Sequence, residues 1–379
     1  MNKLNVVIIT NIPSPYRVDF FNYLHSHEEM LDLRIIYSSK NEENRQWLIE
    51  TDKLRKSYFL DSVTVKVPKK NDTKYIHITT GLGPLLNRIQ PDVVVISEYN
   101  PTALLAVRWC RHRRIPYISW TDGTLNSEKG INSIQRHIRK YIVKHASRFI
   151  ASSSKAKEAQ IAYGADPDKI YLSLLTVDVD SYCSAYPREY SNKILFVGRL
   201  VYGKGLDLLV DALSGVRNNY ILTVVGDGPE RDSVHEYCYQ QLPRDRVIFK
   251  GNLQKEEVIR EYGKNSIFVL PTRNDCFGLV VLEAMCQGLC VICSRYADGV
   301  YDLIRNNDNG YIIDPYNKKE FTGILDELLS DCSLQKKMGG HAISSINKFH
   351  FSSTSEGFVN AVKEATVYHS KTITERKYD

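Results

Sequence analysis

The sequence predicts an α/β protein of two doubly wound domains that face each other across a cleft. Three observations support this prediction. The length of 379 residues suits two domains better than a single hydrophobic core. Short β-branched runs alternate with amphipathic stretches, as in parallel sheets whose strands are joined by crossover helices. The alternation stops at residues 178–193, which lack periodicity, and then begins again, so this segment is the predicted linker.

Residues 1–180 are the predicted first domain, on the acceptor side. Its strands are expected where apolar, β-branched runs occur, at 6–10, 33–37, 93–97, 117–120, 149–152 and 171–175. Its helices are expected at the amphipathic stretches 16–25, 83–89, 102–111, 134–144 and 155–163. Residues 40–75 are polar and are expected to form long loops or short hairpins.

Residues 181–350 are the predicted second domain. The same reasoning places its strands at 194–197, 220–225, 247–250, 267–271, 290–294 and 311–313. Helices are expected at 206–213, 230–241, 255–264, 279–286, 301–305, 318–329 and 333–348. Residues 351–379 are expected to form a last helix and a tail, for which packing back on the first domain is one arrangement. Ligands of open α/β sheets bind beyond the carboxyl ends of the strands, so a site is expected in the cleft.

The composition is that of an ordinary soluble protein, with 43% hydrophobic and 25% charged residues. No run of about 18 apolar residues occurs, so no membrane span is expected. The N-terminus turns polar at Asn11, which is too early for the core of a signal peptide. A cytoplasmic protein is therefore expected.

The cysteines are scattered without the spacing of a disulfide framework, as expected of reduced thiols. Cys290 and Cys293 form a C-x-x-C motif inside a predicted buried strand, without a second pair or a nearby histidine. No metal site is therefore expected. The cysteines are Cys110, Cys183, Cys238, Cys276, Cys286, Cys290, Cys293 and Cys332.

The net charge of +6 is concentrated in the first half of the chain and peaks at residues 108–114 and 131–148. In the second of these segments cations interleave with apolar side chains at helical spacing. Such a face suits an anionic membrane surface or an acidic acceptor, and a solvated helix face is the alternative. Nucleic acid is not expected, because aromatic side chains are not interleaved to stack bases. The cations of the second segment are Arg136, Arg139, Lys140 and Lys144.

The strongest local signal is the segment GRLVYGKGLD, which begins at Gly198 directly after a predicted strand. Gly198 allows a sharp turn there, and two later glycines admit close approach of a phosphate. Arg199 and Lys204 add two cations. This arrangement suits a diphosphate leaving group, whose charge grows as the bond to a sugar breaks. A simple strand–helix loop with solvated cations is the alternative.

A second signal is the segment PTRNDCFGLVVLEAM, which begins at Pro271. A helix is expected to start near Gly278. The amides of Phe277, Gly278 and Leu279 are then expected to be free to bind an anion, with the support of the helix dipole.

Two acids in this segment, Asp275 and Glu283, stand eight residues apart, which is up to about 12 Å along a helix. This spacing suits the two ends of an extended nucleotide sugar, with Asp275 at sugar hydroxyls and Glu283 at ribose hydroxyls. An exposed helix charge is the alternative for Glu283. Its neighbours are apolar, however, and a carboxylate among them needs a partner.

The motifs GRLVYGKGLD, VVGDGPE, VIFKG and PTRNDCFGLVVLEAM, in this order over residues 198–285, resemble the retaining glycosyltransferases of family 4 (glycosyl transferases group 1). That family has the GT-B fold of two Rossmann-like domains. The resemblance implies that Arg199 and Lys204 hold the donor diphosphate, that Glu283 binds the ribose and that residues 251–253 lie near the base. Asp275 stands where the family usually has Glu, which leaves the donor sugar open.

The donor-binding residues predicted on this basis are Gly198, Arg199, Lys204, Gly251, Asn252, Leu253, Asp275, Cys276, Phe277, Gly278, Leu279 and Glu283. The predicted catalytic residues are Asp122, Arg199, Lys204 and Asp275.

The first domain resembles the family less closely, because NIPSPYR at residues 11–17 replaces the usual glycine-rich loop. Ser14 is expected to cap the next helix, and Arg17 in the first turn is a candidate to face the cleft. Asp122, after the strand YISW, is a candidate contact to the sugar at the reacting centre, and a turn-forming Asp-Gly is its alternative. Glu98, after the strand VVVIS, is similarly placed, so Ser14, Arg17 and Glu98 are assigned to the acceptor side.

Together these features predict a glycosyltransferase of the hexosyltransferase type. It is expected to move a sugar from a nucleotide-diphosphate sugar to a glycan or lipid-linked glycan in surface polysaccharide synthesis. The resemblance implies retention of configuration. No metal or cofactor is expected, because no metal-binding or nucleophile motif occurs and two cations and helix amides neutralise the leaving group. A sugar-nucleotide epimerase of the same fold and a non-catalytic nucleotide-sugar-binding protein are the alternatives.

Overall fold

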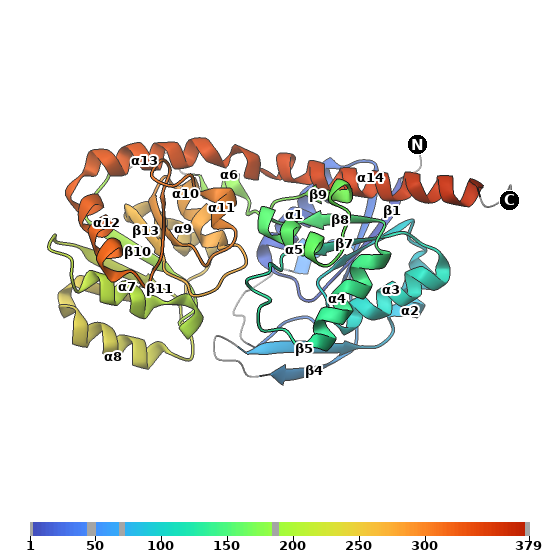
Figure 1. Ribbon diagram of the computed structural model, residues 1–379, viewed down its shortest axis with the longest axis horizontal. Helices are drawn as coiled ribbons and strands as arrows, with labels where there is room; N and C mark the ends of the chain where they lie inside the picture. The colour runs from blue at the N-terminus through green and yellow to red at the C-terminus, as the bar shows by residue number, and fades with distance from the viewer. Residues whose placement is uncertain (1–2, 44–50, 68–72, 184–188, 376–379) are drawn as a thin grey trace. The chain divides into compact units, whose positions relative to one another are not determined.

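The computed structural model describes residues 3–43, 51–67, 73–183 and 189–375, with side chains described as far as Val367. The chain divides into two compact units (Figure 1). Residues 1–69, 73–176 and 351–379 form the first unit, and residues 177–350 belong to the second. The chain thus leaves the first unit four residues before the predicted boundary at residue 180, and its C-terminal segment returns to that unit.

The first unit contains a seven-stranded parallel sheet in the order β3-β2-β1-β6-β7-β8-β9. The strands are β1 (Leu4–Thr10), β2 (Leu31–Tyr37), β3 (Ser57–Phe59), β6 (Val93–Ser97), β7 (Tyr117–Thr121), β8 (Arg148–Ala151) and β9 (Ile170–Leu172). The helices are α1 (Pro15–His27), α2 (Leu82–Ile89), α3 (Pro101–Arg113), α4 (Ser133–His145), α5 (Ser154–Ala162) and α14 (Phe351–Glu375).

Both faces of this sheet are covered, because successive strand residues point to opposite sides. Val6 and Ile8 share a core with α1 and with Phe358 of α14, whereas Val7 and Ile9 share a core with α2, α3 and α4. Strands buried on both sides carry apolar residues at nearly every position, which is why the periodicity of the sequence located them.

Residues 40–75 contain more structure than the polar sequence suggested. β3 adds a parallel strand to the edge of the sheet. β4 (Ser62–Val67) pairs with β5 (Lys74–Thr79) as an antiparallel hairpin. The hairpin agrees with the expectation, whereas β3 was missed because three residues are too few to show a period. Residues 44–50 and 68–72 lie outside the described part of the chain.

The second unit contains a six-stranded parallel sheet in the order β12-β11-β10-β13-β14-β15. The strands are β10 (Lys193–Val197), β11 (Ile221–Val225), β12 (Val247–Gly251), β13 (Ile267–Leu270), β14 (Cys290–Ser294) and β15 (Tyr311–Ile313). The helices are α6 (Val179–Tyr182), α7 (Leu206–Leu213), α8 (Arg231–Gln241), α9 (Lys255–Lys264), α10 (Leu279–Cys286), α11 (Val300–Leu303), α12 (Lys318–Ser330) and α13 (Cys332–Ser345).

The predicted linker at residues 178–193 begins with one helical turn, α6, which Asp178 caps through the amide of Ser181. Tyr182 in this turn is buried, and its carbonyl accepts a hydrogen bond from the side chain of Gln287, which follows α10. The first part of the linker is therefore packed, and the structure does not describe residues 184–188.

Over the described residues, none of the helices combines the length and the apolar character needed to cross a bilayer. In the same part of the chain, no three His, Cys, Asp or Glu side chains are grouped to hold a metal ion. Cys290 and Cys293 are buried in β14 with free thiols.

Candidate active site

The loop after β10 is shaped by glycines that admit close backbone contacts. A Cβ on Gly205, which has φ of 69°, would lie 2.3 Å from the carbonyl oxygen of Pro271. A Cβ on Gly226 would lie 1.9 Å from the carbonyl oxygen of Gly198, so the VVGDGPE motif also depends on glycine for packing. These contacts draw the loops after β10, β11 and β13 together at the carboxyl edge of the second sheet.

Arg273 fixes the turn that carries Lys204 and was missed by the sequence analysis. Its guanidinium donates to both carboxylate oxygens of Asp207 and, at 2.8 Å, to the carbonyl of Tyr202. Its amide donates to the carbonyl of Gly203 at 2.8 Å. A bidentate pair of this kind sets orientation as well as energy. The sequence shows Arg273 as a cation within the second motif, which was the one available signal. Its partner, Asp207, lies 66 positions away in the chain, so the pair could not be predicted.

Lys204 and Asp275, both predicted site residues, form an ion pair through Nζ and Oδ2. Oδ1 of Asp275 accepts hydrogen bonds from the amides of Phe277 at 3.1 Å and Gly278 at 3.0 Å. Burial raises the pKa of Asp275, but Lys204 and these amides outweigh it, so the pKa lies below its ordinary value. Asp275 is therefore an anion that binds both the cation and the helix start.

This arrangement corrects the prediction that the amides of Phe277 and Gly278 are free. The carboxylate of Asp275 occupies both, because the two- and three-residue spacing lets a short aspartate side chain reach back to them. The predicted anion site is thus filled by the protein's own carboxylate. Gly278, with φ of 81°, ends the turn and α10 begins at Leu279.

Glu283 on α10 has the partners that its apolar surroundings require. The hydroxyl of Tyr262 donates to Oε2 of Glu283 at 2.9 Å, and Tyr182 of α6 also donates to this carboxylate. Burial raises the pKa of Glu283, and the two tyrosines partly offset this effect. Neither tyrosine was predicted, since they come from other elements of the chain.

The remaining predicted donor residues lie at the same edge of the second sheet. Gly198 and Arg199 follow β10, and Gly251 ends β12 with φ of 69°. Asn252 is exposed, whereas Leu253 and Cys276 are half-buried. The second sheet thus gathers the residues predicted to bind the donor.

In the first unit, the structure joins two residues that were predicted separately. Arg17, which is only 6% exposed, forms an ion pair with Asp122. The guanidinium carbon of Arg17 lies 3.9 Å from the centroid of the Trp120 ring. The hydroxyl of Ser152 donates to Asp122 and accepts from the indole nitrogen of Trp120 at 3.0 Å. The four side chains form a cluster, the Arg17 cluster, at the carboxyl ends of β7 and β8.

Ser14 stands at the N-cap of α1 with Pro15 at the first helical position, but its side chain does not cap the helix. The hydroxyl instead bonds the side chain of Tyr16. The prediction of a capping role for Ser14 is therefore wrong. Proline already removes one amide that would need a cap, and the hydroxyl is free for another partner.

Glu98 adopts a left-handed conformation, with φ of 77°, directly after β6. Its carboxylate accepts a hydrogen bond from the side chain of Asn11, which in turn accepts one from Asn100. Burial, followed by the nearby Asp122 and Glu42 carboxylates, raises the pKa of Glu98 to about 8. A non-glycine residue in this conformation is uncommon and is often found at functional positions.

Glu98 is expected to make the stability of the protein depend on pH. Because its pKa is raised to about 8 in the folded state, the folded protein holds a proton that the unfolded chain releases at lower pH. The contribution of Glu98 to the free energy of unfolding is fully present below the ordinary pKa of glutamate. It is lost as the pH rises through about 8, the pKa of Glu98 in the folded protein. Glu98→Gln is expected to flatten this decline in Tm, measured by thermal unfolding from about pH 5 to about pH 8. An unchanged slope would contradict the assignment.

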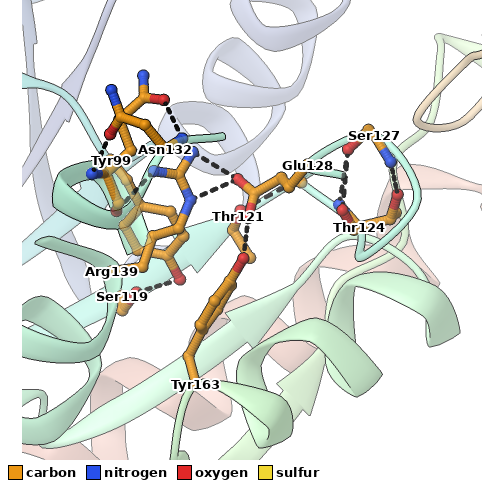
Figure 2. Close-up of polar contacts among 11 residues, drawn as sticks. Tyr99, Ser119, Thr121, Thr124, Ser127, Glu128, Asn132, Arg139 and Tyr163 are labelled. Atoms are coloured by element: carbon orange, nitrogen blue, oxygen red, sulfur yellow. Dashed lines mark hydrogen bonds and ion pairs between the residues drawn. The ribbon is translucent and has the colours of Figure 1, made fainter. Parts of the chain in front are cut away.

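Figure 2 shows a second polar network, the Glu128 network, which holds the loop after Asp122. Oε1 of Glu128 accepts from Nε and Nη2 of Arg139, both at 2.7 Å, and Oε2 accepts from the hydroxyl of Tyr163. A Cβ on Gly123 would lie 3.0 Å from Oε1 of Glu128. The carboxylate therefore lies directly against the residue that follows Asp122.

The Glu128 network corrects the placement of Arg139 on the exposed basic face of α4. Arg139 points inward to Glu128, and its guanidinium carbon lies 5.3 Å from the centroid of the Tyr99 ring. Arg136, Lys140 and Lys144 do lie exposed on α4. The helical period places Arg139 beside the buried Ile142 and Val143, and the acid that pairs with it comes from the loop directly before α4, 11 positions earlier in the chain.

Removing one partner of the Glu128 network is expected to be costly. Glu128→Gln would leave the buried Arg139 without its anion, so the free energy of unfolding is expected to fall by about 3 kcal/mol. Urea unfolding of the purified variant measures this change. The matched control is Glu158→Gln, which breaks the exposed pair Lys155–Glu158 and is expected to cost less than about 1 kcal/mol. Equal losses in the two variants would contradict a special role for Glu128.

The two halves of the chain each match a family of known glycosyltransferases. Residues 185–345 match the family model described as Glycosyl transferases group 1, and residues 52–181 match Glycosyltransferase Family 4. The chain belongs to the family 4 glycosyltransferases. The family predicted from the motifs of the second domain is thereby confirmed.

Several relatives of this family 4 glycosyltransferase are themselves glycosyltransferases. It is 31% identical over 175 residues to an uncharacterized glycosyltransferase of Methanocaldococcus jannaschii, covering 45% of each chain. It is 26% identical to D-inositol 3-phosphate glycosyltransferase of Acidothermus cellulolyticus, over 62% of this chain and 57% of that protein. The matched region thus spans about half the length of these relatives. It is also 26% identical to lipopolysaccharide 1,6-galactosyltransferase of Escherichia coli, over 68% and 70% of the two chains.

Solved structures of low sequence identity share the fold of this family 4 glycosyltransferase. The apo lipopolysaccharide outer core galactosyltransferase WaaB superposes with a TM-score of 0.72 at 19% identity, over 95% of this chain and 99% of that chain. Anabaena HepE in complex with UDP superposes with a TM-score of 0.77 at 15% identity, over the same shares. The predicted GT-B fold is therefore confirmed.

Proposed function

We propose that this chain transfers a sugar from a nucleoside-diphosphate sugar to a hydroxyl of a glycan or lipid-linked glycan in surface polysaccharide synthesis. The observation that carries the proposal is the Lys204–Asp275 pair at the start of α10. It sets a cation, two helix amides and an acid at the edge of the second sheet, where α/β proteins bind nucleotides.

In this proposal the donor diphosphate takes the place of the Asp275 carboxylate. Phosphate oxygens then accept from Lys204 and from the amides of Phe277 and Gly278, with Arg199 as a second cation. Asp275, released from these donors, accepts from hydroxyls of the sugar. Glu283, already bonded by two tyrosines, is fixed in orientation to accept from the ribose hydroxyls. Displacing Asp275 from these donors costs free energy, so the proposed donor is an extended diphosphate sugar that contacts both Asp275 and Glu283.

The proposed chemistry retains the configuration at the reacting carbon and requires no metal or other cofactor. Arg199, Lys204 and the helix amides neutralise the departing diphosphate. The acceptor hydroxyl attacks from the face that the diphosphate leaves, and a phosphate oxygen of the leaving group takes the hydroxyl proton. One sugar–oxygen bond breaks and one forms, so no oxidant or reductant takes part.

We assign Arg17, Ser14 and Glu98 of the first unit to the acceptor side, and Asp122 of the same unit to the sugar at the reacting centre. Asp122 is held by Arg17 and Ser152, so its carboxylate is oriented before substrate arrives. Glu98 with its raised pKa is protonated at neutral pH and is therefore able to donate a hydrogen bond to a hydroxyl. The proposed location is the cytoplasm, at the inner face of the membrane.

Calorimetric titration with UDP, GDP and ADP tests the donor half of this proposal. UDP is the first choice, because the HepE structure that shares this fold contains UDP. We expect one nucleoside diphosphate to bind to the wild type and binding to be lost in Lys204→Ala. Turnover of the matching nucleotide sugar with an acceptor then separates a transferase from an epimerase, which acts without one. Binding without any turnover would leave the non-catalytic alternative.

We further propose that exposed cations of residues 108–114 and 131–148 contact an anionic membrane surface. Arg136→Glu, Lys140→Glu and Lys144→Glu together are expected to weaken binding to vesicles that contain phosphatidylglycerol. Wild-type binding is expected to fade as salt screens the charges. Co-sedimentation with vesicles at low and high salt measures both effects. Arg139 is left unchanged because it is buried, and equal binding of the triple variant would contradict this contact.

A further inference from the structure

The β4–β5 hairpin carries an apolar outer face. Its register sets Val63 opposite Ile78 and Val65 opposite Ile76, so these four aliphatic side chains share one side of the hairpin. Val63 is 70% exposed, Val65 43% and Ile78 52%. We call this surface, Val63, Val65, Ile76 and Ile78, the hairpin face. Antiparallel strands with one side toward water ordinarily carry polar residues there, so this face is unusual.

The other side of the hairpin is anchored to the first unit. His77 and Thr79 are buried, and His77 bonds Thr64 and Glu42 through its two ring nitrogens. The hydroxyl of Thr79 lies 3.0 Å from that of Thr102 at the start of α3. The hairpin face is therefore held outward by a rigid attachment to the unit.

The surroundings of the hairpin face are basic and contain further exposed aliphatic residues. Lys66 and Lys74 lie on the hairpin itself, and Lys66 pairs with Glu43. β5 packs on α3, and α3 packs on α4 (Figure 1). Leu105 on α3 and Ile134 at the start of α4 are both exposed, Ile134 to 69%. The exposed cations on or directly after these two helices include Arg108, Arg111, Arg113, Arg114, Arg136, Lys140 and Lys144.

We propose that the hairpin face inserts among the lipids at the surface of an anionic bilayer. Exposed aliphatic side chains on a unit whose neighbouring helices carry exposed cations match acyl chains below anionic head groups in both polarity and charge. A second copy of the chain fits less well. A two-fold contact sets the same patch against itself, and Lys74, which the register places on the same side as the hairpin face, would then approach its own copy.

The inference rests on the proposed function and narrows its acceptor to one that is carried by a lipid. The hairpin lies beside the proposed acceptor side, since Glu42, the partner of His77, and Lys74 are both close enough to Glu98 to influence its charge. A bilayer that touches the hairpin face would therefore present lipid-linked acceptors next to Glu98 and the Arg17 cluster.

A tryptophan at the hairpin face tests insertion directly. Val63→Trp is expected to show a blue-shifted emission, quenched by brominated acyl chains, when vesicles of phosphatidylcholine with about 30% phosphatidylglycerol are added. The matched control is Ile161→Trp on α5, which is exposed in the same unit and is expected to stay unquenched. An emission from Val63→Trp that vesicles leave unchanged would overturn the proposal.

A second variant separates insertion from charge attraction. Val63→Thr with Ile78→Thr keeps β-branched side chains but adds hydroxyls, so the hairpin is expected to fold. Its vesicle binding at about 0.5 M salt, where exposed charges are screened, is expected to be at least about 10-fold weaker than that of the wild type. Equal binding would overturn the proposal.

Sedimentation without vesicles tests the competing occupant. If the wild type is a dimer and the double variant Val63→Thr with Ile78→Thr is a monomer, a second copy covers the hairpin face. The bilayer proposal would then be wrong. A monomer in both proteins supports it. Neither measurement uses a donor or an acceptor, so a failure here is distinct from a failure of nucleotide binding, which tests the proposed function.

Discussion

Lys204→Ala is expected to lower kcat/KM for the sugar donor by about 10³-fold. Lys204 is the cation that the structure sets against Asp275 and the start of α10. Its loss removes a cation from the proposed diphosphate site and also leaves Asp275, a half-buried anion, with the amides of Phe277 and Gly278 as its partners among the described residues. Steady-state transfer rates measure the kinetic loss, and calorimetry with the matching nucleoside diphosphate measures the loss of binding.

Lys264→Ala is a matched control for this variant. Lys264 also pairs with a carboxylate, that of the buried Glu261, but Lys264 itself is mostly exposed at the end of α9 and Glu261 also pairs with Lys250. We expect wild-type transfer from this control. Circular dichroism and thermal unfolding establish that both variants are folded. Wild-type activity in folded Lys204→Ala would contradict the donor-site assignment.

Arg17→Ala is expected to reduce transfer to acceptor by about 10²-fold or more, with little effect on nucleotide binding. Arg17 is nearly fully buried, and it holds Asp122 while its guanidinium lies against the ring of Trp120. Without it, the hydroxyl of Ser152 is the one hydrogen-bond donor to the Asp122 carboxylate among the described residues, and the carboxylate loses its fixed orientation. The measurement is kcat and KM for donor and acceptor separately, together with calorimetry for the nucleotide.

Arg148→Ala separates a loss of orientation from a loss of stability. Arg148 is a buried arginine of the same unit and pairs with Glu364 on α14. Its removal is expected to lower Tm while the folded fraction keeps its transfer activity. A comparable loss of activity per folded molecule in both variants would contradict a specific role for Arg17.

Most elements of the fold follow from local patterns. Strands such as β6 and β14 are buried at every position because helices cover both faces of a parallel sheet, and a continuous apolar run of four residues before the closing serine is visible in the sequence of each. Glycines and prolines mark the turns between them. β3 and α6 escaped prediction because they are too short to show a period, and only their neighbours in space hold them.

Some residues of the candidate site could likewise be predicted from local patterns, whereas the contacts between them could not. The types and spacing of Arg199, Lys204 and Glu283 pointed to a diphosphate and a ribose, since cations after a glycine turn and an acid on a helix act through local geometry. The occupied amides at Phe277 and Gly278 could not be inferred, because the reach of Asp275 depends on the conformation of the turn.

The sequence by itself determined the family, the two parallel sheets and the residues at the ends of their strands. Only the tertiary structure decided which of these residues meet. Arg17 and Asp122 are 105 positions apart, and Glu128 meets Tyr163 across 35. Such pairs form because the order of strands in the sheet brings distant loops to one edge, and that order leaves no periodic signal in the chain.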